Sequence, residues 1–527
     1  MLINLQPLYS RLGDTSAKAG ISWHQQATWD ALSDRSIDVV INTALSGDGK
    51  SYAAFGAFPS GGVMALYPTN ELVRDQQRQL NHYQNQWRVQ RVTGFDLERW
   101  ASMAKQSKAE TLLDLSDAEV LLTNPDLFYY LHQGNYLKDF LRQGGDGRRA
   151  VSGHRLGLWQ QIDRGFKAIV FDEFHLYQPS QISGVLNTLL LMRSVGMRHK
   201  LVFLSATPHQ HLIKALELAR LKVALIDPAA MNGYSCVGGQ GWRQINQPTA
   251  IDLIPEDRAY DWIQENQKSI LQFWLDYPGS KGAIILNSIA SVKRVKRSLS
   301  KLFSEHGLSV SENTGFTDHE EAQKAITADL VVGTSTLDVG VDFKINWLLF
   351  EGHDAPTFIQ RLGRIGRHSG FDCYQAIAFV PRYVYERIDS HGLNAVSRPE
   401  FTKLIFREHR QINSFEGYYR RWAPIQAFGI GRQLLHPSLD RRYLAAFRQY
   451  QSQAEALWGD SFEHCVERIK SAKEEAVAIG LKKGNPLFAE AASFRGTSSF
   501  QCAAITPSGS YSTYNLPTLL SNYHLMS

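Results

Sequence analysis

Short runs of apolar, often β-branched residues recur along the chain, separated by segments long enough to form a helix. This alternation is typical of parallel α/β units, in which buried strands are joined by crossover helices. The pattern predicts two series of buried strands. The first comprises Asp38–Thr43, Val63–Thr69, Glu119–Thr123, Lys167–Asp172 and Lys200–Ser205, and the second comprises Gly282–Asn287, Leu330–Gly333, Trp347–Glu351 and Tyr374–Val380.

A change in composition separates the two series. The stretch Asp227–Pro255 is rich in Gly, Asn, Gln and Pro, which suits a connection between domains. After about residue 395 helical periodicity replaces the strand pattern, most clearly in LDRRYLAAFRQYQSQAEALW and FEHCVERIKSAKEEAVAIGL. We therefore expect an α/β fold with parallel sheets in residues 1–226 and 227–395, followed by a mainly helical region in residues 396–527.

Composition and charge narrow the class of protein. Of the 527 residues, 43% are hydrophobic and 20% charged, which excludes a disordered or collagenous chain. The formal net charge of +5 permits a nucleic-acid partner but does not by itself indicate one. The four cysteines are too far apart for a zinc knuckle or a CxxC pair. Because no apolar run approaches the ~18 residues of a membrane span, we expect a cytoplasmic protein without a membrane partner.

The segment ALSGDGKS, Ala44–Ser51, directly follows the first predicted strand. Its glycines allow backbone N–H groups to approach phosphate oxygens at the start of a helix. Lys50 would then reach the β- and γ-phosphates, and Ser51 would bind Mg²⁺. The general P-loop pattern has glycine at the position of Ala44, so a glycine-rich turn without a ligand remains the alternative for this segment alone.

The segment VFDEFH, Val170–His175, ends another predicted strand with two adjacent carboxylates. Asp172 would hold Mg²⁺ through water, and Glu173 would act as the general base toward the attacking water. An Asp-Glu pair alone is often a surface loop. Its place behind a buried strand, about 120 residues after the P-loop candidate, favours the catalytic interpretation.

Two further segments carry weaker signals when taken singly. SATP, Ser205–Pro208, ends the next strand, where small hydroxyl residues usually cap helices. QRLGRIGR, Gln360–Arg367, repeats arginine at every third position with glycines between. Such a run is more often a solvated face, but this spacing also suits guanidinium groups that reach a γ-phosphate across a cleft.

Taken in order, these motifs resemble a superfamily-two helicase of the DExH kind, which has two RecA-like domains. ALSGDGKS is similar to that family's first motif, AxTGxGKT, which itself begins with alanine; Ser46 and Ser51 are conservative departures. The matching segments, in chain order, are HQQATWDAL for the Q motif, ALSGDGKS, PTNELVRDQ, LTNPDLF, DEFH, SATP, ILNSIASVKRVKRSL, TSTLDVGVDF and QRLGRIGR.

The resemblance implies ATP and Mg²⁺ as cofactors and assigns roles by position. The nucleotide-binding residues are then Gln25, Ser46, Gly47, Asp48, Gly49, Lys50, Ser51 and Asp342, with Ser51 and Asp172 on the metal. The catalytic set comprises Lys50, Asp172, Glu173, Gln360, Arg364 and Arg367. The residues that couple ATP state to the strand site are His175, Ser205 and Thr207. The nucleic-acid contacts are Thr69, Thr123, Ser288 and Thr334.

Four sequence segments resemble the Cas-three helicase of type I CRISPR interference, most closely the stand-alone form of subtype I-D. They are DEFHLYQPSQ, LLTNPDLF, ENTGFTDHEEA and QRLGRIGRH. This likeness implies a 3′→5′ translocase on single-stranded DNA, recruited to the R-loop of a target-bound effector complex whose large subunit bears the nuclease. We expect no nuclease of the HD type in this chain and interpret the single His-Asp dipeptide, His353–Asp354, as a structural loop. A DExH RNA helicase and an ATP-gated clamp that does not unwind remain alternatives.

Overall fold

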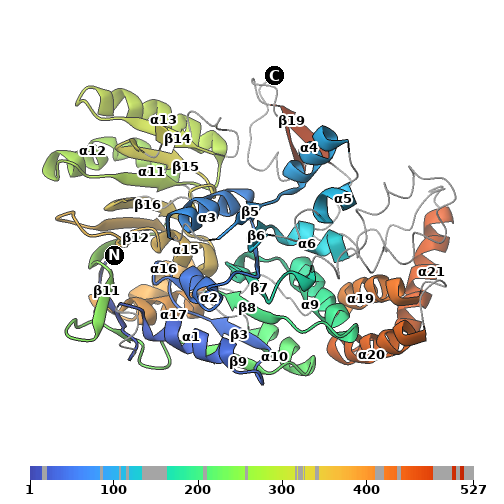
Figure 1. Ribbon diagram of the computed structural model, residues 1–527. Coiled ribbons are helices and arrows are strands. Elements are labelled where there is room, and N and C mark those ends of the chain that lie inside the picture. The colour runs from blue at the N-terminus through green and yellow to red at the C-terminus, as the bar shows by residue number, and fades with distance from the viewer. Residues whose placement is uncertain are drawn as a thin grey trace.

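The computed structural model describes most of the chain. The described residues are 1–14, 20–83, 87–105, 108–113, 118–132, 163–205, 210–255, 259–314, 317, 324–325, 327–338, 344–409, 420–435, 441–478, 501–505 and 511–515. Two large sheets lie side by side, and a group of C-terminal helices packs on the first of them (Figure 1). No described helix is long and apolar enough to cross a membrane.

The first sheet has seven strands, all paired in parallel, in the order β5-β6-β4-β7-β8-β3-β9. All five predicted strands are present, and the central ones are buried along their whole length, as their apolar runs require. Its strands are β3 (Val39–Asn42), β4 (Val63–Leu66), β5 (Val89–Arg91), β6 (Val120–Thr123), β7 (Ala168–Phe171), β8 (Lys200–Leu204) and β9 (Val223–Ile226). Its helices are α1 (Trp23–Ser33), α2 (Lys50–Gly56), α3 (Asn70–Tyr83), α4 (Gly94–Ala104), α5 (Lys108–Leu113), α6 (Pro125–His132), α9 (Pro179–Ser194) and α10 (Gln210–Leu218).

The second sheet has eight strands in the order β14-β15-β13-β16-β17-β12-β1-β18 and contains the four predicted strands. Alternate residues of its buried strands face two separate apolar clusters, one under each layer of helices. Its strands are β1 (Leu2–Leu5), β12 (Thr249–Ile254), β13 (Gly282–Ile285), β14 (Val310–Asn313), β15 (Leu330–Gly333), β16 (Trp347–Glu351), β17 (Gln375–Phe379) and β18 (Ala395–Val396). Helices α11 (Ala259–Glu265), α12 (Gln267–Asp276) and α13 (Ile289–Ser304) cover one face, and α15 (Ala355–Leu362), α16 (Arg382–Asp389) and α17 (Arg398–Glu408) the other.

The expected domain boundary at residue 226 would place β1 in the first domain, which is not where it lies. β1 lies in the second sheet, antiparallel to β12 and parallel to β18. Its partners stand about 250 and 390 residues away in the sequence, so no local pattern indicates them.

The stretch Asp227–Pro255 is likewise more than a connection. It forms β10 (Tyr234–Ser235), β11 (Trp242–Asn246) and β12, and β10 and β11 flank β2 (Leu8–Arg11) in a small antiparallel sheet. The sequence pattern does not predict β10 and β11, because only some of their residues are buried and the stretch is polar and glycine-rich.

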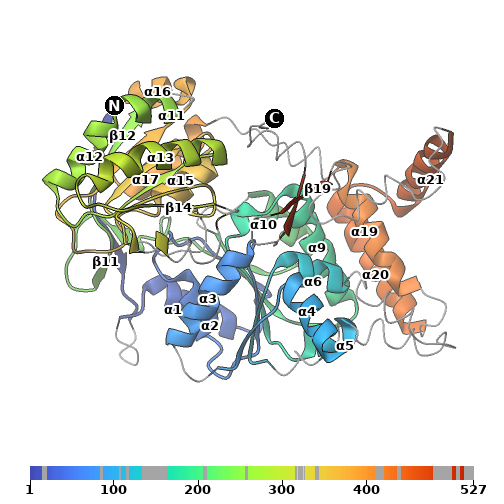
Figure 2. The same cartoon turned by 90° about the horizontal axis from the view of Figure 1, so that it is seen from above.

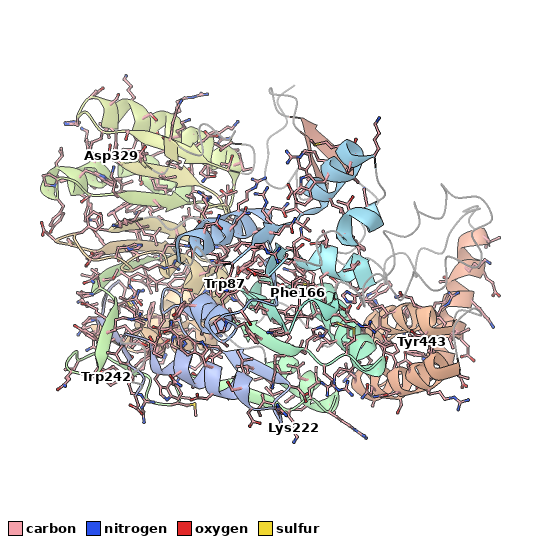
Figure 3. All side chains as sticks on the ribbon, viewed as in Figure 1. Trp87, Phe166, Lys222, Trp242, Asp329 and Tyr443 are labelled. Carbon is pink, nitrogen blue, oxygen red and sulfur yellow. The ribbon has the colours of Figure 1, made fainter. Side chains whose placement is uncertain are left out.

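The C-terminal region is mainly helical, as predicted. Both periodic segments form helices, α20 (Arg441–Trp458) and α21 (Phe462–Ala478), which follow α19 (Ala423–Gly431). Their apolar residues join the core of the first sheet, with α19 and α20 against α9, at the end of the molecule away from the second sheet (Figure 2). Phe166, labelled in Figure 3, belongs to the same core. The described part of the region also contains a short 3₁₀ helix (Arg432–Leu435) and an antiparallel pair of strands, β19 (Gln501–Ile505) and β20 (Tyr511–Asn515).

A buried polar contact fastens the C-terminal helices to the first domain. Asn187 on α9 is fully buried. Its side-chain oxygen accepts a hydrogen bond from Trp458 Nε1 on α20 at 2.7 Å, and its amide donates to Gln426 Oε1 on α19 at 3.1 Å. Because buried polar groups must be paired, this contact fixes how the helices dock.

Replacement of Asn187 by Ala tests this docking. The change leaves the Trp458 N–H and the Gln426 carbonyl without their partner, and each orphaned buried group costs roughly 1–3 kcal/mol. We expect a lower urea midpoint and faster proteolysis within residues 441–478. The exposed Gln272→Ala on α12 is the control, and an equal midpoint in both variants would contradict the prediction.

Candidate functional site

A cavity of about 670 Å³ lies where the carboxyl ends of β3 and β7 face the second sheet. Such edges of parallel sheets are the usual place of ligand sites. The first domain contributes the P-loop, the acidic pair after β7 and Trp87, which is labelled in Figure 3. The second contributes a turn after α15. The lining residues that matter below are Gln25, Ser46, Gly47, Gly49, Lys50, Ser51, Asp172, Glu173, Arg243, Arg364 and Arg367.

The P-loop residues form the turn before α2. Gly47 and Gly49 have φ values of 89° and 84°, which strongly favour glycine. A Cβ on Gly49 would lie 2.5 Å from Gln25 Nε2, so the turn also needs glycine for space. Lys50 begins the helix, and its ammonium donates to the Ala44 carbonyl at 2.8 Å. The backbone therefore presents N–H groups and a lysine toward the cavity, an arrangement that binds phosphate.

The acidic pair lies beside the P-loop. The Ser51 hydroxyl donates to Asp172 Oδ2 at 3.2 Å, and the Glu173 amide donates to Asp172 Oδ1 at 2.8 Å. A hydroxyl and a carboxylate oxygen thus converge, and oxygen ligands are those that Mg²⁺ prefers. The backbone at Glu173 is left-handed, with φ 47°, a strain that is concentrated at functional sites.

The two carboxylates are in different electrostatic states. Burial, followed by repulsion from Glu173, raises the pKa of Asp172 to about 7. Burial would also raise the pKa of Glu173, but His175, Lys50, Arg364 and Arg367 lower it below its usual value. Glu173 is therefore the ionised member at neutral pH, the state that a general base requires.

His175 stands between the acidic pair and the end of β8. Its Nδ1 lies 3.4 Å from Glu173 Oε2 and 3.4 Å from the Ser205 hydroxyl. Burial lowers the pKa of His175, which favours the neutral imidazole. The structure thus brings together two of the three predicted coupling residues, and the third, Thr207, lies outside the described residues.

The turn after α15, Gly363–His368, carries the arginines. Arg364 and Arg367 line the cavity, where Arg364 donates to the Asp338 carbonyl and Arg367 to the Gly363 carbonyl. Arg361 does not line the cavity and is buried, with its Nε 2.9 Å from Asp338 Oδ1. It therefore holds the second domain together instead of reaching the cavity.

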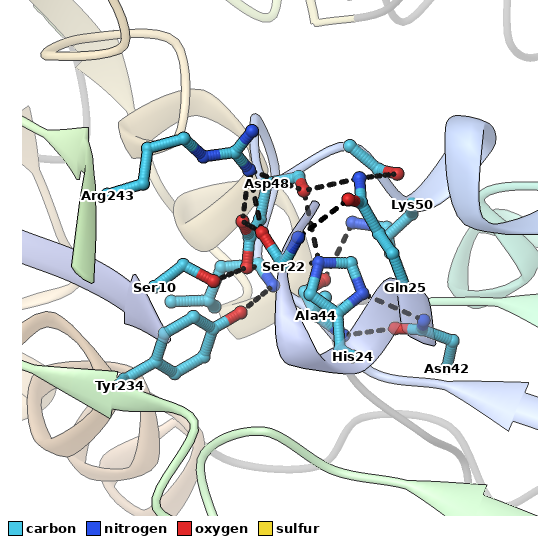
Figure 4. Close-up of polar contacts among 12 residues, drawn as sticks. Ser10, Ser22, His24, Gln25, Asn42, Ala44, Asp48, Lys50, Tyr234 and Arg243 are labelled. Carbon is cyan, nitrogen blue, oxygen red and sulfur yellow. Dashed lines mark hydrogen bonds and ion pairs between the residues drawn. The ribbon is translucent and has the colours of Figure 1, made fainter. Parts of the chain in front are cut away.

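The structure places two of the predicted residues away from the cavity lining. The Gln360 side chain is buried and donates to the Asp338 carbonyl at 3.0 Å. Asp48 is also buried, and its carboxylate accepts hydrogen bonds from Ser10 (2.9 Å), Ser22 (3.1 Å) and Arg243 (3.0 Å), beside His24 (Figure 4). Burial would raise the pKa of Asp48, but His24, Ser10 and Arg243 lower it below its usual value.

Sequence reasoning missed the groups that surround Asp48. Ser10 and Arg243 lie 38 and 195 residues from it and have no motif of their own. Ser22 gave one local signal, because its position three residues before Gln25 is typical of a capping box. Gln25 itself donates to the Gly49 carbonyl at 3.1 Å and lines the cavity.

The four predicted nucleic-acid contacts lie at the carboxyl ends of strands. Thr69 follows β4, Thr123 is the last residue of β6, and Ser288 and Thr334 follow β13 and β15. The Ser288 hydroxyl caps α13, and the Thr123 side chain is fully buried. Thr123 is therefore the least accessible of the four. Asp342 lies outside the described residues.

The dipeptide His353–Asp354 has a structural role. Asp354 caps α15 by accepting a hydrogen bond from the Thr357 amide at 2.9 Å. Within the described part of the chain, no group of three His, Cys, Asp or Glu side chains is arranged to hold a metal ion. Mg²⁺ at Ser51 and Asp172 would accordingly need ligand phosphates and water as well.

Two family models match the sequence. Residues 22–215 match the DEAD/DEAH box helicase model, and residues 278–370 match the C-terminal model of the CRISPR-associated nuclease/helicase Cas3. The first segment holds the P-loop and the acidic pair, and the second holds the arginine turn. The chain is therefore similar to a DEAD/DEAH box helicase in the first of these segments and to the C-terminal part of Cas3 in the second.

Solved helicases share this fold. The Mycobacterium smegmatis helicase Lhr bound to ssDNA and AMP-PNP aligns with a TM-score of 0.53 and 17% identity, over 83% of this chain and 55% of that one. The DUF1998 helicase MrfA bound to DNA and AMPPNP aligns with a TM-score of 0.57 and 17% identity, over 82% and 59%. This chain spans less than two thirds of either helicase. The likeness confirms the predicted pair of RecA-like domains. No curated protein matches the sequence.

The raised pKa of Asp172 predicts a pH-dependent stability cost. The folded chain holds a proton on Asp172 between the unfolded value of 3.8 and about 7, so this group removes stability as the pH rises through that window. In magnesium-free buffer Asp172→Asn should therefore raise the Tm at about pH 8 and have a smaller effect at about pH 4. Thermal melts at both pH values check this, with the exposed Asp30→Asn as control. An equal rise in the Tm of Asp172→Asn at the two pH values would contradict the prediction.

Proposed function

We propose that this chain is an ATP-dependent nucleic-acid helicase. The observation that carries the proposal is the cavity itself, which unites a phosphate-binding loop, an acidic pair and two arginines from two RecA-like domains. A nucleotide kinase would need the first two sets but not arginines from a second such domain. The helicase model match over residues 22–215 supports the same function.

The residues divide the chemistry of ATP hydrolysis. Lys50 and the P-loop amides hold the phosphates, and Glu173, ionised and beside the cavity, orients the attacking water and takes its proton. Arg364 and Arg367 stabilise the charge that develops on the γ-phosphate. Ser51 and Asp172 would hold Mg²⁺, which would supply charge neutralisation on the phosphate oxygens when bound. His175 contacts both Glu173 and Ser205, which directly follows the neighbouring strand β8. It would couple the state of Glu173 to Ser205.

The nucleic acid would run along the carboxyl edges of both sheets. Thr69, Ser288 and Thr334 stand at these edges, where hydroxyl and amide groups contact phosphates without reading the sequence. Because they belong to two domains, a change in the cavity between the domains alters their spacing. That change in spacing would move the strand.

The finer assignment is a 3′→5′ translocase on single-stranded DNA, working in the cytoplasm in type I CRISPR interference. The Cas3-like match over residues 278–370 supports it, and the resemblance to the stand-alone subtype I-D form specifies it further. Its partners would be an R-loop target and an effector complex whose large subunit carries the nuclease. This chain would then translocate on the DNA but would not cleave it.

Strand displacement tests the function. With ATP and Mg²⁺ the purified chain should displace the strand of a duplex with a 3′ single-stranded DNA tail, and DNA should stimulate its ATPase more than RNA does. Glu173→Gln is the control, because it keeps Lys50 and the P-loop and removes only the base; it should bind ATP without turnover.

Each other outcome has a distinct meaning. Stronger stimulation by RNA would favour a DExH RNA helicase, and stimulated hydrolysis without displacement would favour an ATP-gated clamp. Circular single-stranded DNA should stay uncut. Metal-dependent cleavage that tracks the protein through purification and persists in Lys50→Ala would contradict the absence of a nuclease.

The arginine turn makes a separate kinetic prediction. Arg364→Ala or Arg367→Ala should lower kcat by roughly 10³-fold, the size expected for an arginine that stabilises the transition state. Nucleotide binding to the P-loop should persist. Arg382→Ala, an exposed arginine of the same domain, is the matched control. A rise in KM with unchanged kcat would instead assign these arginines to ground-state binding.

A further inference from the structure

A two-stranded ribbon crosses between the two domains. β1 pairs with β12 in the second sheet, where Leu5 stands opposite Thr249. The same two chain segments pair again beside the P-loop as β2 and β11, where Leu8 stands opposite Asn246. We call residues 2–11 and 242–254 together the bridge ribbon. Figure 1 shows β11 extending from the second sheet toward α1 of the first domain.

One end of the bridge ribbon holds the P-loop. Arg243 on β11 donates to Asp48 Oδ1 at 3.0 Å and to the Asp48 carbonyl at 3.3 Å. Ser10 on β2 donates to the other carboxylate oxygen at 2.9 Å, and Tyr234 on the adjoining β10 accepts from the Leu45 amide at 2.8 Å (Figure 4). Asp48 is fully buried and stands between the two P-loop glycines. A shift of the P-loop therefore reaches β11 directly.

The middle of the bridge ribbon holds the arginine turn. Four residues after Arg243, the Gln247 amide donates to the Gly366 carbonyl at 2.7 Å, next to Arg367. Gly366 has φ 79°, and a Cβ there would lie 2.9 Å from Arg398. Arg398 donates to Thr249 Oγ1 at 2.9 Å and to the Ile365 carbonyl at 3.2 Å. The turn is thus fastened to the point where β11 passes into β12.

We propose that the bridge ribbon is a positioning element that transmits the state of the P-loop to Arg364 and Arg367, with Arg243 as its contact residue. The inference rests on the proposed ATP hydrolysis. An extended strand advances about 3.3 Å per residue, so Arg243 and Gln247 join two halves of the site roughly 13 Å apart. The strand carries a bulge between Gln244 and Asn246, a feature that bends strands near functional sites.

The proposal predicts a split between binding and turnover. Arg243→Gln removes the positive charge that faces Asp48 and shortens the side chain, and Ser10→Ala weakens the same end of the ribbon without touching the cavity lining. Each should lower the nucleic-acid-stimulated kcat by about tenfold, within the range typical of coupling between sites. The nucleotide Kd, measured with a fluorescent ATP analogue, should change by less than about threefold for Ser10→Ala. Arg243→Lys, which keeps the positive charge, should restore part of the rate.

Two results would overturn the proposal. One is a stimulated kcat within about twofold of wild type in both variants. The other is a weaker Kd and a lower Tm with unchanged kcat, which would make the contacts a local support of the P-loop. The exposed Arg88→Gln, whose side chain is 75% accessible, controls for loss of positive charge.

Hydrogen exchange separates this inference from the proposed function. In wild type, a non-hydrolysable ATP analogue should slow the exchange of backbone amides in residues 242–247, and Arg243→Gln should abolish that effect. This readout needs no turnover. Wild type without ATPase activity would reject the proposed function, whereas unchanged exchange in wild type that binds the analogue would reject the ribbon alone.

Discussion

The charge balance of the cavity is the constraint on which the rest of the structure depends. Asp172 is buried and Glu173 is largely so, and carboxylates removed from water are costly unless cations face them. One of those cations, Lys50, comes from the same domain, but Arg364 and Arg367 come from the second domain. The first domain alone leaves the pair under-compensated. Approach of the second domain is therefore favoured by electrostatics before any ligand contributes.

The P-loop is likewise held from two sides, by its own helix and by the bridge ribbon. Its own helix provides Lys50 and Ser51, while groups from the bridge ribbon fix Asp48 on the opposite side. Phosphate ligands add negative charge to the first side only. The loop is thus placed between the side that would contact a ligand and a network that is paired in the ligand-free structure, an arrangement that suits the proposed sensing of nucleotide state.

Much of the fold follows from the sequence because its strands are buried on both faces. Apolar runs such as those of β4 and β7 have no other stable place, so they could be predicted directly. β1 and β12 could not, since each is partly polar and its partners are distant in the chain. The site divides in the same way. Motif spacing predicts Lys50, Asp172 and Arg367, but nothing local identifies Arg243 or shows that the Gln360 side chain is turned from the cavity.

The bridge ribbon has a mechanical consequence for how the domains move. A two-stranded ribbon bends easily across its face but resists shear within its plane, because shear would break the hydrogen bonds of the ladder. Here the ladder is interrupted where both segments cross, at Gln6–Pro7 and Gln247–Pro248, and proline has no N–H to pair. The weak line of the ribbon therefore runs through two neighbouring prolines. Rotation about that line meets the least resistance. We therefore expect a hinge motion of the second domain relative to the first, and not a shear motion.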